Sequence, residues 1–346
     1  MKRAGRIYRW IIISVLCQVI LLVFLNNVYL ARRGEATATL VETKEEKPKN
    51  NLKVEIPQNA SKVRVSYDNS FAAYMLDGKL EIMHLSDKKV VKTIQYAQDE
   101  ITLYRWLPDR NMVIYAIKAP DSQAGKVQVV TYNMDSEVEH AYPKITGVPA
   151  KSEITDIELS PLTNVVYAKV TTGSTSAKIY KYDIMSELSF VMNTSDKMVM
   201  KEMNYDNKMI YQDDKNRLFV WDGLKASSKQ LAYKERLALF AVVGLDDEVY
   251  AGELNGEGKV VKIRYGTVDQ TVDKWNTVDL KTPVLPENVF ITADGTVYER
   301  VEDKKLVYNL KNGEKITYEG NFVEIFSKHI VTRDGKTLKI DNIDGK

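Results

Sequence analysis

Histidines are the side chains best suited to bind a metal or to transfer protons near neutral pH, and this chain has three: His84, His140 and His329. None has a cysteine or a second histidine at the spacing that a zinc site requires. Each falls in or beside a different one of the strand repeats described below. We therefore interpret them as surface or strand-end histidines and expect no metal site at these positions.

Motifs for a nucleophile or for phosphate binding are also missing. A hydrolase-type serine would stand in a Gly-x-Ser-x-Gly motif, which the chain does not contain. The segment GELNGEGK, residues 252–259, is similar to a phosphate-binding loop. However, its spacing is one residue too long, and Val260 follows where a serine or threonine would hold magnesium. We interpret this segment as a hairpin turn.

Carboxylates are too numerous to single out. The chain has 47 aspartates and glutamates, so the sequence leaves open a carboxylate pair of the glycosidase type. Three Asp-Gly pairs lack the spaced acidic ligands of an EF-hand calcium loop and are typical of type I′ hairpin turns; they are Asp77-Gly78, Asp294-Gly295 and Asp334-Gly335. We assign no catalytic, cofactor-binding or metal-binding residue and expect no cofactor.

A repeated tyrosine organises the rest of the chain. It ends a short apolar run, and a polar turn and an alternating strand follow, as in MIYQDDKNRLFVWDG at residues 209–223. The intervals between copies are 41, 52, 44, 39, 48 and 33 residues, the range of a four-stranded propeller blade. The copies centre on Tyr74, Tyr115, Tyr167, Tyr211, Tyr250, Tyr298 and, without the ring, Val331.

Each repeat reads as four strands separated by turns. A polar turn precedes each tyrosine run, and an earlier apolar strand, such as the one at residues 288–291, precedes that turn. A single blade cannot bury both faces of its sheet, so neighbouring copies must stack and close a ring. We predict an all-β fold, a seven-bladed β-propeller, with six or eight blades as alternative counts. An irregular β-sandwich and an open β-solenoid are the competing folds.

The repeat shape resembles the β-propeller superfamily, close to WD-repeat-like and dipeptidyl-peptidase-type propeller domains, and the resemblance covers residues 52–346. Two features depart from the WD-repeat pattern. Only one Trp-Asp pair, Trp221-Asp222, stands at a blade position, and no Gly-His dipeptide precedes a copy. The resemblance implies the fold and no activity, because no hydrolase segment follows the repeats.

The last repeat offers only three strands, at residues 322–326, 329–332 and 337–340. A blade that lacks one strand would leave an open edge. The segment Leu52–Ile56 is an alternating strand with no other partner nearby. We predict that it completes the last blade as the outer strand and so joins the two ends of the chain.

The N-terminal region predicts a membrane anchor. Residues 10–30, WIIISVLCQVILLVFLNNVYL, carry no charge and are long enough for a helix to span the hydrocarbon core. Basic residues precede the stretch, which places residues 1–9 in the cytoplasm. We predict a single-pass signal anchor in the plasma membrane, a juxtamembrane linker at residues 31–51 and an extracytoplasmic propeller at residues 52–346.

Two other interpretations of the N-terminus fit less well. A cleaved signal peptide would have a shorter apolar region that ends in a small-x-small site. A lipoprotein would need a small residue before the single cysteine, Cys17, where Leu16 stands. We interpret Cys17 as a membrane-facing side chain.

The net charge argues against a nucleic-acid partner. Positions 1–33 contain six basic residues and no acidic residue. The whole chain has 49 basic and 47 acidic residues, so the chain after position 33 has 43 basic and 47 acidic residues. A surface with a net charge of −4 lacks the basic footprint that nucleic-acid binding requires.

These patterns favour a non-catalytic interaction scaffold, tethered to the membrane as an accessory subunit of a cell-envelope assembly or export system for a surface polysaccharide or protein. The expected partners are the plasma membrane, through residues 10–30, and another cell-envelope protein or polymer. The alternatives are a sensor that binds a small molecule or glycan and, third, a glycan lyase or hydrolase. Ionisable groups clustered in the central funnel would favour the enzyme, and an uncharged, loop-filled channel would favour the scaffold.

Overall fold

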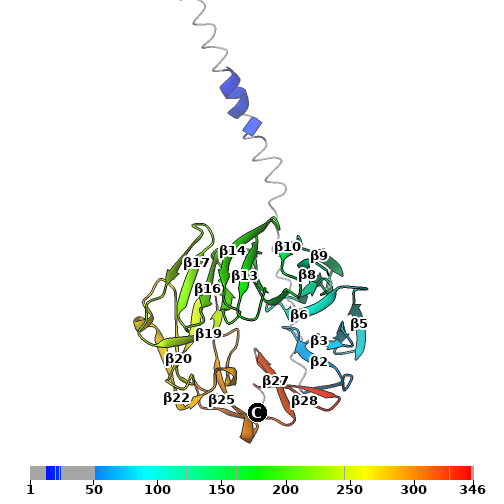
Figure 1. The fold of residues 1–346 in the computed structure, drawn as a ribbon, viewed down its shortest axis with the longest axis vertical. Helices are drawn as coiled ribbons and strands as arrows, with labels where there is room; N and C mark the ends of the chain where they lie inside the picture. The colour runs from blue at the N-terminus through cyan, green and yellow to red at the C-terminus, as the bar shows by residue number, and fades with distance from the viewer. Residues whose placement is uncertain are drawn as a thin grey trace, which may run out of the picture. The chain divides into compact units, whose positions relative to one another are not determined.

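The structure is a computed structural model that describes residues 13–19, 21–22, 24, 51–121, 123–160, 162–244, 246–326 and 328–343. Contacts divide the chain into two units, Met1–Pro48 and Lys49–Lys346. The second unit is a ring of seven β-sheets (Figure 1). The predicted seven-bladed β-propeller is therefore confirmed, and the β-sandwich and β-solenoid alternatives are wrong.

Little of the predicted anchor can be compared with the structure. The described residues 13–19, 21–22 and 24 are helical, and their large apolar side chains are exposed. The rest of the predicted anchor at residues 10–30, and all of the predicted linker except Asn51, lie outside the described residues. Among the helices within the described ranges, none combines the length and apolar character needed to traverse a bilayer.

Blades 1 to 3 follow one another in chain order, and every strand pairs antiparallel with its neighbours. Blade 1 consists of β2 (Ser61–Val65), β3 (Phe71–Leu76), β4 (Lys79–His84) and β5 (Lys89–Ile94). Blade 2 consists of β6 (Glu100–Trp106), β7 (Met112–Lys118), β8 (Gly125–Asn133), β9 (Val138–Ala141) and β10 (Ile145–Val148). Blade 3 consists of β11 (Glu153–Leu159), β12 (Val166–Thr171), β13 (Ala177–Tyr182) and β14 (Leu188–Thr194).

Blades 4 to 6 repeat the arrangement, with three short 3-10 helices in their connections. Blade 4 consists of β15 (Val199–Glu202), β16 (Lys208–Gln212), β17 (Leu218–Asp222) and β18 (Ser227–Gln230). Blade 5 consists of β19 (Arg236–Val243), β20 (Glu248–Leu254), β21 (Val260–Gly266) and β22 (Asn276–Val284). Blade 6 consists of β23 (Val289–Ile291), β24 (Val297–Val301), β25 (Leu306–Asn309) and β26 (Lys315–Thr317).

Blade 7 joins the two ends of the described propeller. It contains β27 (Asn321–Phe326), β28 (His329–Asp334) and β29 (Thr337–Asn342), and its outer strand is β1 (Leu52–Glu55). Leu52 pairs with Ile340, and Glu55 pairs with Thr337. The predicted closure is therefore confirmed: the first strand of the propeller covers the edge that the last repeat leaves open.

Blade 2 departs from four strands because its outer strand is broken. Both β9 and β10 pair with β8, one after the other along its length. Pro143 lies between them and has no N–H to donate to the ladder. The backbone there pairs through Tyr142, whose N–H donates to Val129 O at 3.0 Å.

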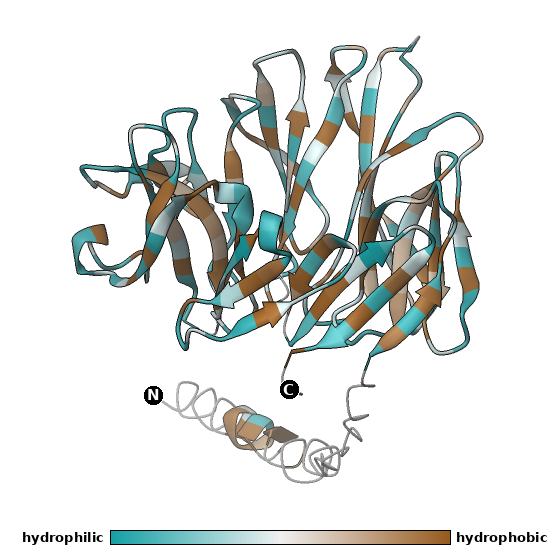
Figure 2. Ribbon diagram, turned by 90° about the horizontal axis from the view of Figure 1, so that it is seen from below, coloured by the Kyte–Doolittle hydropathy of each residue, from teal (hydrophilic) through white to brown (hydrophobic). Residues whose placement is uncertain are grey.

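The core is divided among the junctions between blades. Seven clusters of buried apolar side chains are present, and each one spans a single pair of neighbouring blades. The second strands, which pack on both faces, are buried along nearly their whole length, as in β7 and β12, whereas polar residues interrupt the apolar ones on many other strands (Figure 2). No blade therefore keeps its apolar faces dry without both neighbours.

The repeated tyrosine lies on the second strand of each blade. Five of the six rings are buried in these junctions, as the repeat predicts, and Val331 takes the same place in blade 7. Tyr211 is the exception, because it is half-buried and its hydroxyl donates to Ser228 Oγ at 3.0 Å.

The predicted type I′ geometry is present at only one of the three Asp-Gly pairs. Asp77 and Gly78 both have positive φ, which is the predicted type I′ geometry. At the other two pairs only the glycine has positive φ, so type I′ is wrong there. At Asp294 the physical reason is a cap: its carboxylate accepts hydrogen bonds from Thr292 Oγ1 at 2.6 Å and Thr296 N at 3.1 Å.

Removing residues 335–346 deletes β29, the strand to which both β1 and β28 pair. We expect the loss of β29 to open the ring and abolish cooperative unfolding of the propeller, measured by circular dichroism during urea denaturation. As the control, removal of residues 344–346 alone should leave the transition unchanged. A folded, cooperative propeller without residues 335–346 would contradict the closure argument.

Candidate interaction surface

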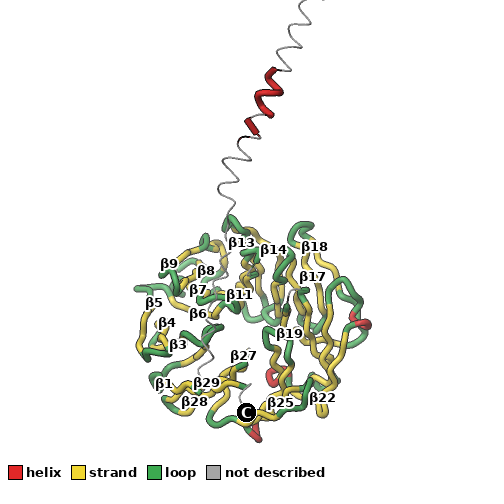
Figure 3. Tube along the Cα trace, turned by 180° about the vertical axis from the view of Figure 1, so that it is seen from behind, coloured by secondary structure: helices red, strands yellow, loops and turns green. Residues whose placement is uncertain are grey.

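The strand order fixes which turns share a face of the propeller. In blades 1 to 6 the innermost strand is the first in chain order, and in blade 7 it is β27, with β1 at the outer edge (Figures 1 and 3). We number the strands of each blade from the innermost outwards. Turns between strands one and two and between strands three and four therefore lie on one face. Leu52 pairs with Ile340 and Ile340 with Val331, so the described chain enters β1 at this face. We call it the entry face.

Exposed apolar side chains concentrate on the entry face. Eleven large apolar or aromatic side chains of the described propeller are exposed. Six of these lie in turns of the entry face, whereas only Leu285 lies in a turn of the opposite face. Five of the six come from blades 3 and 4, are between 46% and 85% exposed, and form what we call the apolar turn surface: Leu162, Ile184, Met185, Tyr205 and Leu224.

Side-chain caps hold these turns in one conformation. In blade 3, Asp183 Oδ1 accepts hydrogen bonds from the N–H groups of Met185 and Glu187, both at 2.9 Å. In blade 4, Asp222 Oδ1 accepts from the N–H groups of Leu224 and Lys225, both at 3.0 Å. These backbone hydrogen bonds hold the pKa of Asp222 below its ordinary value, so it is ionised as a cap. The apolar tips are thus presented by preformed turns.

The turns that carry Leu162 and Tyr205 are tied to each other and to blade 5. Ser160 Oγ donates to Asn204 O at 2.9 Å and accepts from Thr163 N at 3.2 Å. The buried carboxylate of Asp247 accepts from Asn204 N at 2.6 Å and from Tyr205 N at 3.1 Å. Three consecutive blades therefore fix the inner part of the apolar turn surface.

Acidic side chains border this surface. Several exposed carboxylates in the entry-face turns of blades 2, 3 and 5 form no ion pair with another described residue, among them Asp135, Glu137, Glu187 and Asp246. In the turns of blade 4, Lys225 pairs with Asp222 at 3.4 Å and Lys208 pairs with Asp206. An apolar centre with an acidic border is the anatomy of a binding surface whose partner has a basic rim.

The innermost strands carry a cluster of ionisable groups. Arg105 on β6 donates to Asp156 Oδ1 at 2.9 Å and to Glu158 Oε1 at 2.6 Å, both on β11. Lys201 on β15 donates to the same oxygen of Glu158 at 2.5 Å. Burial opposes ionisation of Glu158, but Lys201 and Arg105 hold its pKa below the ordinary value. The cluster therefore ties the inner strands of three blades through matched charges.

Glu202 lies next to this cluster without a partner. It is 6% exposed, and neither of its carboxylate oxygens has a hydrogen-bond partner within the described part of the chain. Burial, with the nearby charge of Glu158, raises the pKa of Glu202 well above its ordinary value. The buried site therefore favours the protonated form of Glu202. Its environment is that of a carboxylic acid, not of a carboxylate.

A second inner-strand pair joins blade 7 to blade 1. Glu324 on β27 accepts a hydrogen bond from Val65 N at 2.8 Å, and Arg64 Nε lies 3.5 Å from its other oxygen. Burial raises the pKa of Glu324 to about 7, against the smaller opposing effects of Arg64 and the Val65 N–H. This junction is therefore sensitive to pH in the neutral range.

The three histidines belong to different blades. His84 contacts Asp87 at 3.1 Å on the outer part of blade 1, and His140 contacts Ser186 at 3.3 Å across the junction of blades 2 and 3. His329 begins β28, as expected for a strand-end histidine, but it is buried and its Nε2 lies 2.9 Å from Asn69 Nδ2. Within the described residues, no three His, Cys, Asp or Glu side chains are grouped as metal ligands.

Two other candidate positions have structural explanations. Residues 255–259 form the turn between β20 and β21, so the segment similar to a phosphate loop is a hairpin turn, as predicted.

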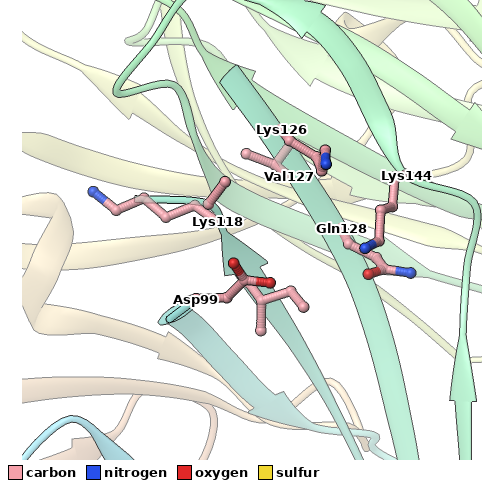
Figure 4. A pocket seen from close by; sticks show the side chains of 8 residues that line it. Asp99, Lys118, Lys126, Val127, Gln128 and Lys144 are labelled. Atoms are coloured by element: carbon pink, nitrogen blue, oxygen red, sulfur yellow. The ribbon is translucent and has the colours of Figure 1, made fainter. Parts of the chain in front are cut away.

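A shallow pocket on blade 2 is lined by Asp99, Lys118, Lys126, Gln128 and Lys144, among others (Figure 4). Its volume of about 10 Å³ has room for about one water molecule.

Sequence reasoning missed both the apolar turn surface and the charged inner strands. The turns SPLT and NYDN were recognisable as polar turns, yet each contains one large apolar or aromatic residue where turn chemistry requires none. A large apolar or aromatic residue within an otherwise polar turn is the sequence feature that indicates this surface. The partners of Arg105 lie more than fifty positions away along the chain, and no local pattern predicts such a contact.

Comparison with known proteins identifies the fold and no family. No protein-family model matches this chain, and no curated protein matches it. A solved oligogalacturonate lyase in complex with manganese is 12% identical, with a TM-score of 0.55, and the match covers 85% of this chain and 91% of the other. The β-propeller domain of Cps50 (Swd1) from Myceliophteria thermophila is 13% identical, with a TM-score of 0.52, and the match covers 83% and 97%. At these identities the similarity shows a shared β-propeller fold.

The substitution Glu324→Gln should change how stability depends on pH. An acid whose pKa is raised in the folded state binds a proton that the unfolded chain releases, so stability falls as pH rises from about 4.5 to about 7. The shift corresponds to at most about 3 kcal/mol. Glutamine cannot titrate, so in urea unfolding measured from pH 4 to pH 8 the variant should lose the part of the slope that Glu324 contributes and keep the part that Glu202 contributes. As the control, Glu81→Gln on β4 should keep the full slope. Parallel wild-type and Glu324→Gln curves would contradict the assignment.

Proposed function

We propose that this protein is a membrane-tethered, extracytoplasmic interaction scaffold without catalytic activity. Residues 10–30 anchor it in the plasma membrane as a single pass with the N-terminus in the cytoplasm, and the propeller binds another component of the cell envelope. An accessory role in the assembly or export of a surface polysaccharide or protein fits this arrangement.

The apolar turn surface is the observation that carries this proposal. Five large apolar or aromatic side chains exposed on the same face of two neighbouring blades are a candidate for protein binding. Here the tips are held by caps, and preformed turns lose less conformational entropy on binding than mobile ones. The concentration of exposed apolar turn residues on one face supports a docking role for blades 3 and 4.

The apolar character of residues 10–30 and the basic residues before them support the tether. The described helical residues of this stretch present large apolar side chains to their surroundings, which suits a lipid environment. They include Leu16, Leu21 and Leu22.

A second candidate function rests on the inner strands. Four ionisable groups lie on the innermost strands, and the buried acid Glu202, whose pKa is raised, lies beside them; the four are Arg105, Asp156, Glu158 and Lys201. Such a cluster favours a site for a polar ligand such as a glycan, or a glycan-active enzyme. Its charged members are already matched to one another, so the scaffold remains our first proposal. Assay of the purified protein on acidic and neutral glycans, with Glu202→Gln as the comparison, tests the second.

The tether is tested by placing charge in the apolar stretch. The test variant carries both Leu16→Asp and Leu21→Asp. Each aspartate should raise the free energy of membrane insertion by about 3 kcal/mol, because a carboxylate at the centre of a membrane helix is strongly disfavoured. We expect the double variant to leave the membrane pellet after alkaline carbonate extraction. Leu16→Ile with Leu21→Ile is the matched control and should stay in the pellet. Full retention of the aspartate variant would argue against the anchor.

The docking surface is tested with Met185→Ser and Leu224→Ser combined in the full-length protein. The two side chains are 77% and 85% exposed, so their loss should leave thermal stability within about 0.5 kcal/mol. Recovery of a crosslinked envelope partner from intact cells should fall about tenfold or more. Val91→Ser with Leu285→Ser, which removes exposed apolar side chains elsewhere, is the control and should have no effect. Equal losses in the two double variants would contradict the proposal.

A further inference from the structure

The entry face combines three features: the apolar turn surface, an acidic border, and the point where the described chain enters the propeller at Asn51. We propose that the apolar turn surface docks on the extracytoplasmic surface of an integral membrane protein, at an apolar patch bordered by lysine and arginine. This proposal rests on the membrane tether of the proposed function and adds the class of partner and its charge.

The position of the chain entry selects a partner close to the membrane. Residues 31–51 join the apolar stretch to β1, and a chain of this length reaches at most about 75 Å even when fully extended. The described chain enters β1 on the entry face, so this connection attaches to the propeller on that face. A partner in the same membrane is within reach of a propeller held in this way.

The charges favour a protein over the bilayer itself. Loop tips with leucine, isoleucine and methionine could also insert into lipid, but surfaces that bind anionic membranes carry lysine and arginine. In the turns that flank the apolar turn surface, several exposed carboxylates have no ion pair with a described residue, among them Asp135, Glu137, Glu187 and Asp246. They would be repelled by anionic lipid headgroups and attracted by a basic protein rim.

The rigidity of the turns points the same way. The turn at Ile184 and Met185 is capped by Asp183, and that at Tyr205 is held by Asp247 from the next blade. Tips fixed relative to one another across two blades match a surface of defined shape. A protein offers such a surface, whereas a fluid bilayer does not.

The experiment uses the full-length protein in intact cells, with a photo-crosslinking amino acid at position 185 or 224 and, as controls, at position 91 or 285. We expect crosslinks from 185 and 224 to one integral membrane protein, at extracytoplasmic residues flanked by lysine or arginine, and none to it from 91 or 285. Charge reversal by Glu187→Lys with Asp135→Lys should lower the crosslink yield at position 224 about fivefold. The control reversal Glu257→Lys with Asp214→Lys, on the opposite face, should leave it unchanged.

Other outcomes would overturn the inference. Crosslinks from 185 and 224 to lipid would assign the surface to the bilayer, and crosslinks to a second copy of this chain would assign it to self-association. A crosslink yield at position 224 that is unchanged by the charge reversal would also contradict the proposed partner. The absence of any crosslink from positions 185 and 224 would contradict it as well. Carbonate extraction of the same cells separates this failure from that of the proposed function: a protein in the pellet keeps its tether, and a protein in the supernatant has none.

Discussion

Every blade of this propeller depends on its two neighbours to keep its apolar faces out of water. The buried side chains form one cluster per junction, and the ring has no separate core inside any blade. Each fully buried tyrosine or branched aliphatic side chain contributes about 1.5–3 kcal/mol through burial, so a junction of about ten such groups outweighs any single polar contact. The ring is therefore stable only when complete, and the pairing of β1 with β29 is the contact that completes it.

Polar groups stabilise other parts of this fold. They cap the turns at the ends of the strands and connect the innermost strands of neighbouring blades. Arg105 and Lys201 bring the inner strands of blades 2, 3 and 4 together through Glu158. On the entry face, aspartates cap turns whose backbone N–H groups would otherwise depend on water. The capped turns can expose leucine, methionine and tyrosine because their conformation does not depend on those side chains.

The asymmetry between the two faces links the fold to the proposed function. Antiparallel strands in a fixed order put alternate turns on opposite faces, so a set of turn residues scattered over some sixty positions of the chain becomes one surface. The same order puts the entry of the chain on that face. The proposed docking surface and the attachment of the N-terminal segment therefore belong to one face of the propeller.

The sequence by itself determined the blade repeat, the positions of most strands and the closure through Leu52–Ile56. These depend on local alternation, turn residues and the open edge of the last repeat. It also determined that the tyrosines pack between blades, although Tyr211 is only partly buried where it packs against the cluster between blades 3 and 4.

Only the tertiary structure decided which turns share a face and which charges meet at the axis. Leu162 and Leu224 are 62 positions apart and belong to one surface because two blades pack side by side. Arg105 finds its acidic partners in the next blade. Side chains that are far apart in the sequence come together only when whole sheets pack against one another. A local sequence pattern does not specify which sheets pack together.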